Sequence, residues 1–89
     1  MSSDVKSKRL TSTGSAGVGP ARIRQVQVKT TTGTPRLTFT DGNGGPVILD
    51  MDLDASKTHS VNIPSDGIRV SDIFVSVFTA CTSITIFHS

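Results

Sequence analysis

The stretch Ile73 to Phe87 constrains the fold most strongly, because it holds three of the four Phe residues and is apolar on both faces of an extended strand. Side chains alternate between the two faces of a strand, so the odd positions from Ile73 to Val77 share one face and Phe74 and Phe78 share the other. A short polar connection then leads to a second apolar run, Ile84 to Phe87. The pattern predicts a central hairpin that other strands cover on both sides.

Composition favours strands along the rest of the chain. Ser, Thr, Val and Ile make up 40 of the 89 residues, whereas Ala and Leu occur four times each and Glu is absent. β-Branched residues favour strands, while Ala, Leu and Glu are strong helix formers. Every acidic residue is Asp, which favours turns and strand ends over helix interiors. We therefore expect little or no helix.

Chain length allows one domain of marginal stability, since a chain of this size buries only about 60–65% of its unfolded surface. The single cysteine, Cys81, excludes an intrachain disulfide, so self-association is the expected supplement to the core. No signal-like apolar run follows Met1, and no apolar stretch approaches the roughly 20 residues of a membrane span. We expect neither export by a signal peptide nor insertion in a membrane.

Alternating apolar residues and turn signals predict six or seven short strands. The strongest turn signal, Asp41 to Pro46, contains Asn and three glycines and predicts a hairpin loop. After it, alternate residues from Val47 to Leu53 are expected to face inward. Ile23 is out of phase with the residues that follow, which indicates a β-bulge. The expected strands are 22–29, 36–40, 47–54, 60–63, 68–70, 73–78 and 84–87, with a turn at 65–67.

These elements predict an all-β fold, either a small antiparallel β-sandwich or a jelly-roll-like barrel, formed by one domain over residues 21–89. Residues 1–20 contain few large apolar side chains and end in the glycine-rich stretch Gly14 to Pro20. We interpret them as a flexible basic N-terminal arm that reaches a neighbouring subunit. Deleting residues 2–19 is accordingly expected to leave the melting temperature nearly unchanged and to weaken attachment.

Charge is divided unevenly along the chain, although the net charge is only +2. Residues 1–40 carry seven basic residues and one acidic residue, a net +6, and residues 41–89 carry two basic and six acidic residues, a net −4. Such asymmetry favours attraction between unlike parts of neighbouring copies, or contact with an acidic partner. The alternative is a solvated surface on which the charges mix in three dimensions.

The acidic residues Asp50, Asp52 and Asp54 raise the question of calcium, which prefers oxygen ligands. The EF-hand pattern fails, because its Gly and Glu positions fall on Ala55 and Val61. Residues two apart on a strand project about 6.5–7 Å from each other, which is too far for three carboxylates to converge on one ion without a bend. We expect no metal site and a solvated acidic face.

Other candidate sites carry weak signals. His59 and His88 have no metal ligands spaced around them, and Cys81 lies in a polar segment with no sign of activation. The glycine-rich stretches 14–19 and 42–45 match neither a dinucleotide fingerprint nor a P-loop. We therefore predict no enzymatic activity, no catalytic residues and no cofactor.

The predicted interaction residues are basic and lie mostly in the N-terminal part of the chain. They could neutralise phosphates, but the chain contains no Trp or Tyr on which bases could stack, so nucleic acid is disfavoured as a partner. These residues are Lys6, Lys8, Arg9, Arg22 and Arg24.

Three segments together carry a resemblance to a protein class. They are Arg36-Leu-Thr-Phe-Thr-Asp-Gly-Asn-Gly-Gly-Pro-Val-Ile-Leu, Val61-Asn-Ile-Pro-Ser-Asp-Gly-Ile-Arg-Val and Ile84-Thr-Ile-Phe-His88. From about Arg22 to Ser89, this sequence pattern of strand and turn segments resembles that of the small all-β virion structural proteins of tailed bacteriophages. The segment before residue 21 lies outside the resemblance, which transfers no binding residues.

The resemblance implies a non-enzymatic virion subunit that decorates or cements the capsid through subunit contacts. Its partners would be other virion proteins, either the major capsid protein or a tail protein, together with further copies of itself. It implies localisation in the virion after synthesis in the host cytoplasm. Two alternatives stay open: a subunit associated with the tail or a fibre, and a carbohydrate- or receptor-binding β-sandwich module. The lack of Trp and Tyr weighs against sugar binding.

Overall fold

The computed structural model describes residues 5–63 and 67–89, and all regular secondary structure in these ranges is β-strand. The described residues form nine strands, two more than the largest predicted number. They are β1 (Lys6–Leu10), β2 (Gly14–Ser15), β3 (Ala21–Thr30), β4 (Arg36–Asp41), β5 (Val47–Asp52), β6 (Thr58–Asn62), β7 (Ile68–Val70), β8 (Ile73–Thr79) and β9 (Cys81–His88).

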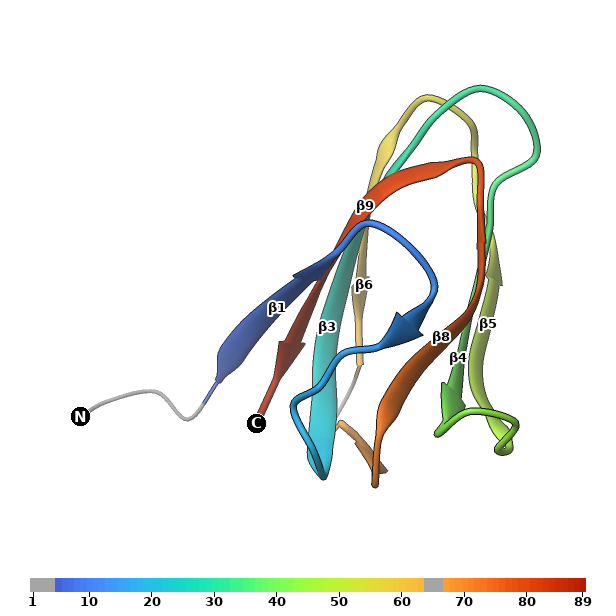
Figure 1. Cartoon of the computed structure of the whole chain (residues 1–89). Helices are drawn as coiled ribbons and strands as arrows, with labels where there is room; N and C mark the ends of the chain where they lie inside the picture. Colours follow the sequence, from blue (N-terminus) through green and yellow to red (C-terminus); the bar gives the residue numbers. More distant parts are fainter. Residues whose placement is uncertain (1–4, 64–66) are drawn as a thin grey trace.

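Two antiparallel sheets face each other, as Figure 1 shows. The first, here called sheet A, has the order β1-β9-β3-β6, and β7 also pairs with β3. The second, sheet B, has the order β2-β8-β4-β5. Strands β6 and β7 follow one another along the same edge of β3. The predicted all-β class and β-sandwich are confirmed.

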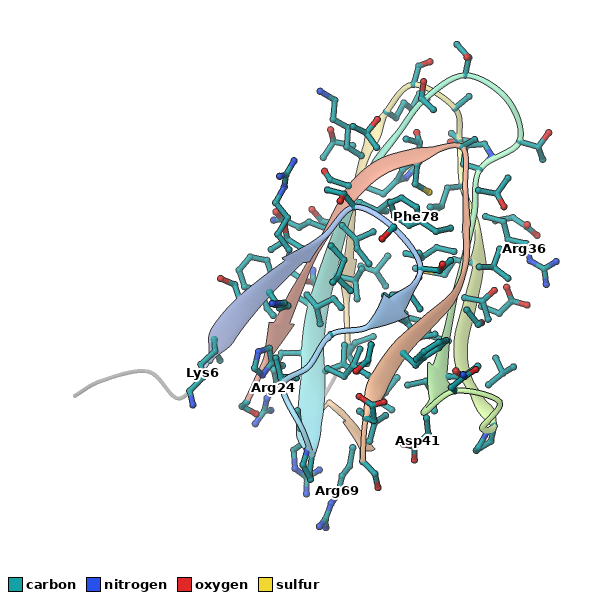
Figure 2. The ribbon with its side chains drawn as sticks, in the orientation of Figure 1. Lys6, Arg24, Arg36, Asp41, Arg69 and Phe78 are labelled. Atoms are coloured by element: carbon teal, nitrogen blue, oxygen red, sulfur yellow. The ribbon has the colours of Figure 1, made fainter. Side chains whose placement is uncertain are left out.

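The core lies between the sheets and takes residues from both. Phe39 and Leu37 on β4 face Ile23 on β3 and Ile86 on β9, and all four side chains are fully buried. Figure 2 shows Phe78 in the space between the two layers. The buried apolar residues are Ala16, Ala21, Ile23, Val26, Val28, Leu37, Phe39, Val70, Ile73, Val75, Ile84 and Ile86.

The central segment Ile73 to Phe87 supplies part of this core, but it is not a hairpin. β8 belongs to sheet B and β9 to sheet A, so the chain crosses from one layer to the other at Ala80, which has a φ of 52°. The short polar connection has the sequence character of a hairpin loop. It joins the two sheets because each strand finds its hydrogen-bonding partner in its own layer, β8 with β4 and β9 with β3.

The predicted faces of β8 are also wrong beyond its first half. Val75 pairs with Phe39, but the register then shifts, and Val77 and Phe78 pair with Thr38 and Leu37. Directly opposed residues of an antiparallel pair share a face. Phe78 therefore joins the core side with Leu37, and Val77 turns to the outer side. The irregularity inverts the alternation that the sequence pattern assumes.

The predicted hairpin loop at Asp41 to Pro46 is confirmed, since it joins the paired strands β4 and β5. A Cβ added at Gly45 would meet the carbonyl oxygen of Asp41, so only glycine fits the tight turn. The Asp41 carboxylate accepts hydrogen bonds from the N–H groups of Ser71 and Asp72, at 2.9 and 3.2 Å, and ties this turn to the start of β8. Val47 was expected to face inward, but it is 61% exposed beside a register shift in the β4–β5 pair.

The predicted bulge near Ile23 is confirmed by the pairing of β3 with β9. Ile23 pairs with His88 and Gln25 with Phe87, so Arg24 is the extra residue. The bulge puts Ile23 back in phase with the other inward-facing residues of β3. The predicted turn at residues 65–67 lies mostly outside the described residues.

The N-terminal segment, predicted as an arm outside the domain, forms part of both sheets over its described residues. β1 pairs with β9 along five residues, and β2 pairs with β8. Ala16 is buried in the core, and Leu10 and Val18 pack against it. The prediction of an arm was based on the low apolar content of this segment. The segment is instead attached to the sheets by backbone hydrogen bonds and by three small or medium apolar side chains. The boundary at residue 20 therefore does not separate an arm from a body.

Candidate functional site

The structure divides the five predicted interaction residues into three groups. On β1, Lys6 and Lys8 pair with His88 and Ile86, and both of these partners face the core. Arg9 pairs with Thr85 and therefore points to the opposite, outer side of sheet A. Arg22 and Arg24 lie two strands away on β3.

The positions of Lys6 and Lys8 favour protection of an edge over binding. β1 is the edge strand of sheet A, and both lysines are exposed although they lie on its inner side. Charged side chains on the inner side of an edge strand discourage another strand from pairing there. Burial lowers the pKa of His88 below its ordinary value, and the charge of Lys6 lowers it further. His88 is only 6% exposed.

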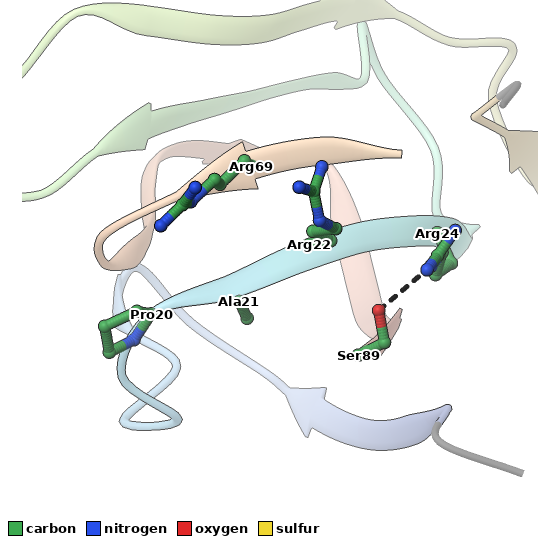
Figure 3. Close-up of a pocket in the computed structure, with 6 residues that line it drawn as sticks. All are labelled: Pro20, Ala21, Arg22, Arg24, Arg69 and Ser89. Carbon is green, nitrogen blue, oxygen red and sulfur yellow. Dashed lines mark hydrogen bonds between the residues drawn. The ribbon is translucent and has the colours of Figure 1, made fainter. Parts of the chain in front are cut away.

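Arg22 and Arg24 meet a third arginine that the sequence does not single out. Arg22 pairs directly with Arg69 of β7, and its backbone N–H and C=O bond to Ser89 on the other side, both at 2.9 Å. Arg24, at the bulge, donates a hydrogen bond from Nε to the Ser89 hydroxyl at 2.9 Å. Figure 3 shows Arg22 between Arg69 and Arg24. The contribution of Arg69 depends on the β3–β7 register, for which the sequence carries no local signal.

These residues line an open cavity of about 500 Å³, here called the arginine cavity. The side chains of Arg22 and Arg69 make no hydrogen bond or ion pair with any residue in the described ranges. The cavity therefore holds at least two guanidinium groups whose hydrogen-bonding capacity is directed to solvent. Its lining residues are Pro20, Ala21, Arg22, Arg24, Arg69 and Ser89.

The arginine cavity belongs to a larger basic surface on the outer side of sheet A. Cross-strand pairing places the outward-pointing side chains of β3 on the same surface as the outward-pointing side chains of β1, β6, β7 and β9. No carboxylate occurs among the outward positions of these five described strands. We call this surface the basic face, and its cations are Arg9, Arg22, Arg24, Lys29 and Arg69.

The acidic residues of β5 lie on the opposite, outer side of sheet B. The Arg36 guanidinium holds Asp50 in a two-point ion pair, at 2.9 and 3.2 Å, and the Thr38 hydroxyl donates to the same carboxylate at 2.8 Å. The hydrogen bonds from Arg36 and Thr38 lower the pKa of Asp50. Figure 2 shows Arg36 on the far side of the sandwich from Arg24. Asp50 therefore already has its partners within the chain.

Asp52 and Asp54 remain exposed on the same acidic segment. The Asp54 carboxylate is 76% exposed and lies 3.9 Å from the Lys57 ammonium, a long surface pair. Over residues 5–63 and 67–89, no group of three or more His, Cys, Asp or Glu side chains comes close enough to hold a metal ion. The three aspartates therefore do not converge in the structure.

The remaining candidates make structural contacts. Burial raises the pKa of the Cys81 thiol, which donates to the carbonyl oxygen of Thr79 at 3.2 Å, so the reactive thiolate is disfavoured. The His59 ring lies 3.1 Å from the carbonyl oxygen of Asp54. Neither side chain lines the arginine cavity.

Comparisons of the chain with protein-family models, with curated proteins and with solved structures find no match. In the part of the chain that the structure describes, no helix is long and apolar enough to cross a membrane.

Proposed function

We propose that this chain is a non-enzymatic structural subunit of a bacteriophage particle, namely a decoration or cement subunit that binds the outside of the capsid. The observation that carries the proposal is the basic face. Five cations spread over an open sheet surface suit contact with an extended acidic protein surface better than enclosure of a small substrate. The assignment of this contact to a phage particle rests on the resemblance of the strand and turn segments to small virion proteins.

Electrostatic attachment has a specific consequence for this face. Contacts between complementary charged surfaces speed association and weaken as salt rises, whereas contacts through a buried apolar patch do not. The exposed large apolar side chains in the described ranges are Val5, which precedes β1 of sheet A, and Val47, which begins β5 of sheet B, so they form no joint patch. Attachment through the basic face should therefore be sensitive to salt.

Copy number tests the proposed function. Quantitative mass spectrometry of purified particles, from a phage that encodes this chain, should find it in amounts comparable to the major capsid protein. A few copies per particle would instead assign the chain to the tail or a fibre. Its absence from purified particles would reject a virion role.

A binding assay tests the face. Full-length chain should sediment with particles stripped of it, and Arg9→Gln combined with Lys29→Gln should reduce the bound fraction at low salt. Lys57→Gln is the matched control, because it removes a cation that lies in the β5–β6 connection, outside the basic face. Equal loss with the control would show that only net charge matters.

A further inference from the structure

Two arginines stand directly opposite each other in the arginine cavity. Arg22 and Arg69 are a cross-strand pair of β3 and β7, which places their Cβ atoms about 4.5–5.5 Å apart on the same face. Like charges in this position destabilise a sheet. No described residue offers either guanidinium a counterion.

The bulge in β3 adds to this concentration of charge. An unbroken strand would direct Arg24 to the face opposite Gln25, but the extra residue lets its side chain reach Ser89 on the outer side. Three guanidinium groups consequently line one open cavity. Planar guanidinium groups bind carboxylates in two-point pairs, as Arg36 and Asp50 do elsewhere in this chain. The cavity is therefore suited to an anion whose oxygen atoms accept hydrogen bonds, such as a carboxylate.

The chain itself carries a matching anionic surface. β5 is an edge strand of sheet B, and it pairs only with β4 over the described residues. Asp50 is occupied by Arg36 and Thr38, whereas Asp52 at the end of β5 and Asp54 just after it are exposed, and Asp54 makes only the long 3.9 Å surface pair with Lys57. Residues two apart are about 6.5–7 Å apart along an extended chain, so these two carboxylates can reach neighbouring guanidinium groups.

We propose that the arginine cavity of one copy binds the carboxylates of Asp52 and Asp54 of a second copy. This inference rests on the proposed function, for which it names one partner. The two surfaces lie on different sheets, so the contact is head-to-tail. A contact of this kind repeats from copy to copy and builds a ring or a filament.

Two pairs of neutral substitutions remove one surface each. The cavity variant carries Arg22→Gln and Arg69→Gln, and the strand variant carries Asp52→Asn and Asp54→Asn. Sedimentation velocity at low salt should show concentration-dependent association of the wild-type chain. The dissociation constant of each variant alone should be higher by a factor of about ten or more. A control that keeps both surfaces, Lys29→Gln, should associate as the wild type does.

Mixing the two variants gives the decisive measurement. The strand variant retains an intact cavity and the cavity variant retains intact carboxylates, so a one-to-one mixture has one working contact per pair. It should form a discrete dimer that does not extend. Thermal melts of both variants confirm that they are folded. The cavity variant should melt at a slightly higher temperature than wild type at low salt, because the opposed charges are gone.

Three outcomes would overturn the proposal. The first is a wild-type chain that stays monomeric at low salt and high concentration, and the second is a mixture that stays monomeric while the wild type associates. The third is a saturable response to inorganic phosphate that the cavity variant loses while self-association is unchanged, because the site would then serve phosphates. High copy number in particles together with a monomeric chain would reject this contact and leave the proposed function standing.

Discussion

The outer face of sheet A carries five cations and no carboxylate among its described positions, whereas the outer face of sheet B combines Arg36 with Asp50 and Asp52. On sheet B, the charges serve the chain itself, since Arg36 and Thr38 both bond to Asp50. On sheet A, Arg22 and Arg69 are opposed with no described partner. The two layers share one core but use charge differently.

This difference indicates which layer faces a partner. A satisfied ion pair at a surface contributes little to binding, because separating it costs what a new contact returns. Cations without internal partners carry no such cost. Sheet A is therefore the layer from which we expect salt-sensitive contacts, and Asp52 and Asp54 are the part of the sheet B side that remains available.

Deletion of residues 2–19 should have the largest effect, because it removes an edge strand from each layer. Sheet A loses β1 and sheet B loses β2, and the core loses Ala16 with its neighbours Leu10 and Val18. Loss of these contacts should cost about 3–6 kcal/mol, a large part of the stability of a domain this small. Thermal and urea melts should show an unfolded or much weakened chain.

Full-length chain with Lys6→Gln and Lys8→Gln is the control for this deletion. It removes the charges of β1 and keeps its backbone pairing with β9, so it should melt close to wild type. A truncated chain that melts within 2 °C of the full-length chain, a shift worth about 0.5 kcal/mol or less at this size, would contradict the structure. Such a result would support the prediction from sequence that residues 1–20 form a flexible arm.

Gly67→Ala should have the second-largest effect, and it should be confined to sheet A. Gly67 has a φ of 79°, and an added Cβ would collide with the carbonyl oxygen of Ile23. The substitution should cost about 1–3 kcal/mol in backbone strain and force β7 away from β3. Amide hydrogen exchange should accelerate at residues 21–23 and 68–70, and Arg69 should leave the arginine cavity.

Gly44→Ala is the matched control in sheet B. Gly44 has a nearly equal φ of 78°, but an added Cβ there meets no atom within 4 Å. The Gly44→Ala variant should carry a similar backbone strain, but it should not lose strand pairing as the Gly67→Ala variant loses the β3–β7 pair. Similar exchange patterns in both variants would mean that the close approach of Gly67 to β3 does not position the cavity.

Local patterns in the sequence predict features that depend on neighbouring residues. The turn Asp41 to Pro46 follows from residue types that tolerate its backbone angles, and the bulge near Arg24 follows from the phase of Ile23. The all-β class follows from the abundance of β-branched residues and the absence of Glu. The first two inferences use a range of a few residues, and the third uses the composition of the whole chain.

Features that depend on the choice of a distant partner were not predicted. The segment around Ala80 looks like a hairpin loop, but the chain there changes layers because β8 pairs with β4 and β9 with β3. Arg69 joins Arg22 only through the register of β7. The N-terminal strands gain most of their attachment from backbone pairing, which leaves little trace in side-chain hydrophobicity.

His88 should give sheet A a pH dependence near neutral pH, whereas Asp50 of sheet B acts only in acid. Burial and then Lys6 lower its pKa, so the folded chain resists protonation more than the unfolded chain does. Stability from this group is therefore constant above the ordinary pKa of 6.5 and falls as the pH drops below it, until the folded pKa is reached. Melting temperatures measured between about pH 7 and 5 should decline, and His88→Gln should flatten the decline.

Two further variants sharpen this result. Lys6→Gln removes one of the two causes of the shift, so its decline should be shallower than that of wild type. His59→Gln lies on β6, away from the β1–β9 pair, and should leave the decline unchanged. An equal decline in His88→Gln and wild type would assign the pH dependence to other groups.

The smallest expected effect concerns Asp50, and it measures how far sheet B satisfies its own charges. Hydrogen bonds from Arg36 and Thr38 lower its pKa below 3.8, so the pair adds stability above that pH, and the contribution is lost as the pH falls through the lower folded pKa. Asp50→Asn should reduce the melting temperature slightly at pH 7 and converge with wild type in acid. Lys29→Gln on the basic face should change the melting temperature at neither pH. If Lys29→Gln were instead the more destabilising change, the cations of sheet A would be stabilising the fold, and the contrast between the two faces would fail.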